Sequence, residues 1–79
     1  MDGKLLGLEW SNSTKKAMML LDDAGIPYSL VDLEESSSRK MEAMVALTGK
    51  TEIPQLFVGG ISYVGLERIR IYIGITIGV

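Results

Sequence analysis

The sequence predicts an α/β fold in which helices cover both faces of a mixed four-stranded sheet, in the order β-α-β-α-β-β-α. Three observations lead to this prediction: helical patterns that each follow a short apolar run, a proline that opens a β-forming run, and a Gly-Gly pair that ends it. Strands joined through a helix run parallel with a right-handed crossover, whereas a hairpin is antiparallel, so the sheet has to be mixed. The 79 residues are expected to form a single domain, residues 1–79.

The hairpin is the clearest element of the sequence. Pro54 has no backbone donor and therefore belongs at the start of a strand, here residues 55–58. The pair Gly59-Gly60 supplies the positive φ angles that a tight turn needs. Residues 61–64 are then expected to return as the partner strand.

The elements before the hairpin follow from hydrophobic periodicity. Residues 4–9 predict a buried first strand, and residues 28–33 predict a second. Between them, apolar residues recur at helical spacing over residues 13–24, directly after a cluster of residues that favour a helix N-cap. A second helical pattern opens at residues 34–38 and ends at Gly49.

The segment after the hairpin, residues 66–73, is ambiguous. Its β-branched residues and its alternation of Arg and Ile favour a strand. Its apolar residues also share one helical face: Leu66, Ile69, Tyr72 and Ile73. The topology favours a short helix, and residues 74–79 carry no assignment.

Composition excludes several classes of function. A net charge of −2 without any block of Lys or Arg argues against a nucleic-acid surface. The absence of cysteine and histidine excludes disulfides, zinc sites of the Cys/His kind and catalysis by thiol or imidazole, and no metal is expected. No apolar run approaches the roughly 18 residues of a membrane span, and the first residues do not form a secretory signal, so a cytoplasmic location is expected.

Charged residues near the ends of the first expected helix are placed against its dipole. Lys15 and Lys16 fall in the first turn, where the helix is positive, and Asp22 and Asp23 fall near the last, where it is negative. This arrangement favours the attraction of an anion to the unpaired backbone N–H groups at residues 11–14. The alternative is that all four charges are solvated surface residues without a role in binding.

The hydroxyl residues at this helix start are Ser11, Ser13 and Thr14. Each either caps the helix by accepting a backbone N–H, or donates a hydrogen bond to a bound thiolate or carboxylate. None is expected to act as a covalent nucleophile, because the sequence has no histidine to serve as its base.

Residues 20–33 and 47–60, together with residues 65–67, resemble the glutaredoxin family, and the resemblance covers about residues 4–73. It implies a thioredoxin-like three-layer sandwich, a cis peptide bond before Pro54, and a groove for glutathione. In that groove the backbone of Ile53 would pair with the cysteinyl part of glutathione. An acidic side chain, here Glu67, would face its amine. The implied groove residues are Ser13, Lys50, Ile53, Pro54, Leu66 and Glu67.

The sequence also departs from the family pattern. The two redox cysteines of the family fall on Ser11 and Thr14, so thiol–disulfide exchange is excluded. Leu8 takes the place of a lysine, and Glu52 takes the place of a threonine, and both changes weaken the expected grip on an anionic ligand. The sequence leaves open whether the cysteines were lost naturally or by engineering.

Three hypotheses follow. The first is a glutaredoxin-like protein, redox-inactive as written, that keeps a groove for glutathione or for an extended peptide of a partner protein. The second resembles the N-terminal domain of glutathione transferases, in which Ser11 or Ser13 would stabilise a glutathione thiolate, although such enzymes need a second, helical domain. The third is an interaction module that binds a partner strand beside Pro54, with the isoleucine-rich residues 69–79 serving homo-oligomerisation through β-pairing.

Overall fold

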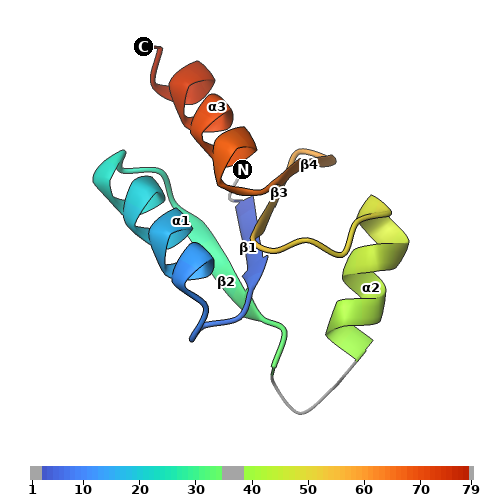
Figure 1. Cartoon of the computed structure of the whole chain (residues 1–79). Helices are drawn as coiled ribbons and strands as arrows, with labels where there is room; N and C mark the ends of the chain where they lie inside the picture. The colour runs from blue at the N-terminus through green and yellow to red at the C-terminus, as the bar shows by residue number, and fades with distance from the viewer. Residues whose placement is uncertain (1–2, 35–38, 79) are drawn as a thin grey trace.

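The computed structural model describes residues 3–34 and 39–78. Its elements follow in the predicted order: β1 (Gly3–Gly7), α1 (Asn12–Asp23), β2 (Tyr28–Asp32), α2 (Arg39–Thr48), β3 (Gln55–Val58), β4 (Ile61–Val64) and α3 (Leu66–Ile77). They form three layers, with α1 and α3 side by side on one face of the sheet and α2 on the other (Figure 1). No helix in the described part of the chain is long and apolar enough to cross a membrane.

The sheet has the strand order β2-β1-β3-β4. Strands β1 and β2 are parallel, with Leu5 opposite Leu30, whereas β3 runs antiparallel to both β1 and β4. The predicted mixed sheet is therefore confirmed. The hairpin is also confirmed at its predicted residues, and the φ angles of Gly59 and Gly60 are 58° and 80°.

The main core lies between the sheet and the pair α1 and α3. Five side chains there are 0–1% exposed, contributed by β1, α1, β3 and α3: Leu5, Ala17, Leu21, Leu56 and Ile69. Leu5 and Leu56 are paired across β1 and β3, so the two central strands supply the floor of this core. On the opposite face, Met44 of α2 is also buried.

Helix α3 resolves the ambiguous segment. The predicted inward face is confirmed: Ile69 is fully buried, and Leu66, Tyr72 and Ile73 pack against the core. The helix is longer than predicted and continues through Ile77, although Ile75 and Ile77 are exposed. Packing of Ile69, Tyr72 and Ile73 on the core favours the helix in its first turns despite the weak helix propensity of isoleucine. The prediction that residues 69–79 self-associate by β-pairing is therefore wrong for the helical part of this segment, because its backbone N–H and C=O groups bond within the helix. Self-association through the exposed helix face stays a prediction.

Two further boundaries differ from the prediction. The first strand ends at Gly7 instead of Glu9, and a turn follows in which Ser11 donates its backbone N–H to the carbonyl of Leu8 (2.8 Å). Glu34 lies in a turn and not in a helix, because its N–H donates to Oδ1 of Asp32 (3.0 Å) and this local bond competes with helix formation. Residues 35–38, the rest of the expected helix opening, lie outside the described residues.

Candidate functional site

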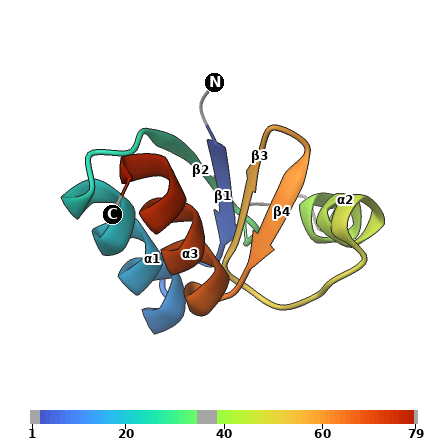
Figure 2. The same ribbon diagram turned by 90° about the horizontal axis from the view of Figure 1, so that it is seen from above.

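The candidate site lies at one edge of the sheet, where several predicted residues converge. Leu6 pairs with Gln55, and Gln55 pairs with Val64, so β1 and β4 end at the same edge at which β3 begins. Helix α1 follows β1, and α3 follows β4, so both helix N-termini lie there too. Figure 2 shows the two helix starts and the chain entering β3 at one end of the sheet. The topology thus gathers residues 11–14, 53–54 and 65–67.

Ser11 and Ser13 form a hydroxyl pair at the start of α1. Ser11 is the N-cap residue, with φ −72° and ψ 133°, but its side chain makes no capping hydrogen bond. Its Oγ lies instead 3.0 Å from Oγ of Ser13, and both residues are half-buried. The expected role of the Ser11 side chain as a helix cap is therefore wrong. A pair of hydroxyls with one bond between them keeps one O–H available for a ligand.

Thr14 has a different environment. It is fully buried, and its Oγ1 accepts the backbone N–H of Leu8 at 3.2 Å. It also packs on Gly7, where an added Cβ would lie 2.5 Å from that same Oγ1. Thr14 thus fixes the start of α1 against the end of β1, and its hydroxyl faces the interior and not the ligand side.

The start of α3 is tied to the Ile53-Pro54 peptide, which is cis. Gly65 donates its backbone N–H to the carbonyl of Pro54 at 2.8 Å, in a conformation with φ +87° that favours glycine. Pro54 is buried and Ile53 is half-buried. The Leu66 side chain packs into the core, so only its backbone is placed to face a ligand, whereas Glu67 is exposed in the first turn of the helix.

Gln55 is a residue of the site region that the sequence analysis missed. Its side chain is fully buried, and its Nε2 donates to the carbonyls of Lys50 and Glu52, both at 3.0 Å. Its Oε1 accepts the Ser62 hydroxyl at 2.9 Å. The first two bonds hold the loop that leads to Ile53, and the third ties Gln55 to β4. The signal available in the sequence was a polar residue inside an apolar strand. The Lys50 side chain is exposed on this loop.

Lys15 lies near acidic residues. It lines a surface depression of about 360 Å³ together with Glu9, Asp32 and Glu34. Trp10 also lines this depression and donates its Nε1–H to the Glu34 carboxylate. Lys15 and Lys16 are both exposed, as expected if these charges are solvated surface residues without a role in binding.

Asp22 near the end of α1 has a partner. Burial raises the pKa of the Tyr28 hydroxyl above its usual value, and the charge of Asp22 and its hydrogen bond with Tyr28 raise it further. Asp22 thus joins α1 to β2. Among the described residues, no group of three or more acidic side chains is arranged to hold a metal ion.

The sequence model of the glutaredoxin family matches residues 12–62, well over half of the chain. The chain belongs to the glutaredoxin family. No curated protein matches the sequence. Because the sequence contains no cysteine, this glutaredoxin is redox-inactive in thiol–disulfide exchange.

Solved structures share the fold at low sequence identity. A glutaredoxin from Archaeoglobus fulgidus is 14% identical with a TM-score of 0.78, and the match covers 89% of this chain and 80% of that one. A buckwheat glutaredoxin in complex with glutathione is 17% identical with a TM-score of 0.77, covering 96% and 78%. Glutathione S-transferase-I bound with lactoylglutathione is 19% identical with a TM-score of 0.79, covering 96% of this chain but 37% of that one. The fold is the thioredoxin-like fold.

Proposed function

We propose that this glutaredoxin binds glutathione without exchanging thiols, at the sheet edge where α1 and α3 begin. The observation that carries the proposal is the convergence of two helix N-termini with the backbone of Ile53. Glutathione carries two carboxylates, and a helix N-terminus binds an anion through its unpaired N–H groups. The buckwheat glutaredoxin solved with glutathione supports the same ligand.

Each part of the ligand has a proposed partner. The backbone of Ile53 pairs with the cysteinyl part, and the N-terminus of α3 at Leu66 takes the γ-glutamyl carboxylate while Glu67 faces the amine. Lys50, exposed on the loop that Gln55 holds, serves the glycine carboxylate. Pro54 shapes the groove and accepts the hydrogen bond that positions Gly65.

A second candidate function uses the hydroxyl pair. Ser11 and Ser13 share one hydrogen bond, so one of the two hydroxyl protons can be donated to a glutathione sulfur placed at the start of α1. Such a bond favours the thiolate and lowers the pKa of the bound thiol. This is the chemistry of a transferase-like site. Because the chain covers only 37% of glutathione S-transferase-I, transfer to an electrophile is the less supported proposal.

Calorimetric titration with reduced glutathione tests the first proposal. Glu67→Gln removes the proposed contact with the ligand amine and is expected to weaken binding about 2- to 5-fold, the range of an exposed ion pair. Glu42→Gln, at an exposed acid in the first turn of α2, is the matched control and should leave binding unchanged. Equal affinities for both variants would contradict the assignment of Glu67. The absence of heat in the unmodified protein would contradict glutathione itself and leave an extended peptide as the occupant.

The same titration separates the second candidate. S-methylglutathione cannot ionise at sulfur, so a site that stabilises a thiolate should bind it more weakly than glutathione as the pH rises. Ser11→Ala with Ser13→Ala should remove that difference. A pH-independent ratio of the two affinities would rule the transferase-like chemistry out.

A further inference from the structure

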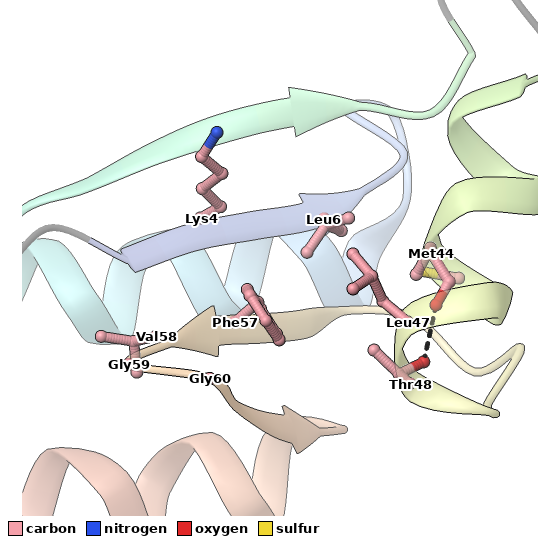
Figure 3. A pocket seen from close by; sticks show the side chains of 9 residues that line it. All are labelled: Lys4, Leu6, Met44, Leu47, Thr48, Phe57, Val58, Gly59 and Gly60. Atoms are coloured by element: carbon pink, nitrogen blue, oxygen red, sulfur yellow. Dashed lines mark hydrogen bonds between the residues drawn. The ribbon is translucent and has the colours of Figure 1, made fainter.

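A cavity of about 410 Å³ lies on the face of the sheet opposite α1 and α3 (Figure 3). Lys4 and Leu6 are alternate residues of β1 and share this face, and Phe57 of β3 is paired with Lys4. Helix α2 closes one end of the cavity with Leu47, and Lys4 also lines it. The cavity is therefore bounded by the sheet below and by a helix at one end, and the ammonium of Lys4 lies beside it, over β2 (Figure 3).

The lining is apolar except at Lys4. Leu6, Leu47 and Phe57 contribute carbon surface. The hydroxyl of Thr48, which also lines the cavity, already donates to the carbonyl of Met44 at 2.9 Å and accepts the N–H of Lys50 at 3.2 Å. Of the described residues that line the cavity, Lys4 alone is charged. An occupant thus meets apolar walls and one ammonium group.

The charge of Lys4 has no counter-ion on this face of the described sheet. The registers place Ser29 of β2 beside Lys4, and Ser62 of β4 beside Phe57, so no strand residue there is acidic. The cavity is also distinct from the helix N-termini. It extends from the hairpin turn along the sheet to Leu6 and α2, and none of residues 11–14, 53–54 and 65–67 lines it.

We propose that this cavity binds a small amphipathic anion, a molecule with an alkyl or aryl body and a carboxylate. The body packs on Leu6, Leu47 and Phe57, and the carboxylate faces the ammonium of Lys4. The volume lies within the roughly 300–1,000 Å³ of small-molecule sites, which combine apolar walls with a few polar groups. A protein surface is a poorer match, because the flanking strand residues Ser29 and Ser62 interrupt the apolar area that an interface core requires.

The test uses phenylbutyrate and phenylbutylamine, which have the same apolar body and opposite charges. Amide NMR titration is expected to show saturable shifts with phenylbutyrate at Leu6, Leu47 and Phe57. Phenylbutylamine should bind about 3- to 10-fold more weakly, because it meets the same walls and a like charge.

Matched variants assign the two halves of the site. Lys4→Gln should weaken phenylbutyrate about 2- to 5-fold without weakening phenylbutylamine, whereas Lys16→Gln, an exposed lysine of α1, should change neither. Leu47→Asp should weaken phenylbutyrate at least about tenfold, because it places a carboxylate in the apolar wall. Ile75→Asp is its control, since Leu47 is 67% and Ile75 71% exposed and neither change should unfold the protein.

Three results would overturn the proposal. One is equal affinity for the two probes. Another is a set of shifts at Ser11, Ile53 and Glu67, which would place the anion at the helix N-termini. The last is a dimer of the unmodified protein that phenylbutyrate does not dissociate and Leu47→Asp does, which would make a second copy of the chain the occupant.

Discussion

Helices α1 and α3 together bury five core side chains to 0–1% exposure against one face of the sheet, whereas α2 on the other face leaves Leu47 67% exposed beside a cavity of about 410 Å³. The first face is packed as a protein interior normally is, and the second keeps a hollow that a packed core would fill. The contrast teaches that the face covered by α1 and α3 supplies most of the buried core, whereas the face covered by α2 supplies the open volume for binding. The proposed glutathione site lies at the edge, where the tightly packed helices begin.

The largest expected effect compares one leucine from each face. Leu21→Ala in α1 should lower the free energy of unfolding by about 2–5 kcal/mol, because it opens a cavity in a filled core. Leu47→Ala in α2 should lower it by less than about 0.5 kcal/mol, because the side chain is mostly solvated. Urea denaturation of both variants measures the difference. Equal losses would break the comparison between the faces.

A substitution at the contact between Gly7 and Thr14 tests how tightly α1 packs against the end of β1. Gly7→Ala places a Cβ about 2.5 Å from Oγ1 of Thr14 and should cost about 1–3 kcal/mol of stability. In a Thr14→Ala background the same change should cost clearly less, because Oγ1 and Cγ2 of Thr14, at 2.5 and 2.8 Å, are gone and only the Cβ at 3.2 Å remains. A double-mutant cycle measures this coupling. Additive losses would show that the two residues do not restrict each other.

Gln55 links stability to the site edge. Gln55→Ala should cost about 1–3 kcal/mol, because it leaves buried polar partners without their hydrogen bonds. It should also speed hydrogen exchange across residues 50–53 and weaken glutathione binding. Ser62→Ala removes one of the three bonds and leaves the loop contacts in place, so it should change exchange there much less. Identical exchange in both variants would show that Gln55 does not order the loop.

The smallest expected effect is a pH dependence at Tyr28. Its pKa is raised in the folded protein, first by burial and then by Asp22, so the folded state holds the phenol proton more tightly than the unfolded state. The stabilisation is complete below pH about 10 and is lost as the pH rises through the folded pKa. Tyr28→Phe should flatten this alkaline decline in denaturation experiments. If Tyr28→Phe leaves the alkaline loss of stability unchanged, that loss arises from other titrating groups.

Local signals explain why most of the fold could be predicted. Pro54 and the pair Gly59-Gly60 act through their own backbone limits, so the hairpin was predicted at its observed residues. The state of α3 was not predictable in this way. Its isoleucines favour a strand in isolation, and packing of Ile69 and Tyr72 against distant elements favours the helix instead.

The candidate site was less accessible from the sequence. The resemblance brought together residues 11–14, 53–54 and 65–67, and the structure places them at one edge. It did not show that Thr14 is buried on Gly7, or that Ser11 pairs with Ser13 and leaves the cap bond unmade. These features depend on contacts between elements, which no local pattern of residues specifies.

The central claim is that glutathione binds at the edge formed by the two helix N-termini, and one amide NMR titration with reduced glutathione tests it most directly. Saturable shifts at Ser11, Ser13, Ile53, Leu66 and Glu67, with none at Leu47 or Phe57, are the predicted result. No shifts up to several millimolar ligand, or shifts confined to the cavity beside α2, would contradict it.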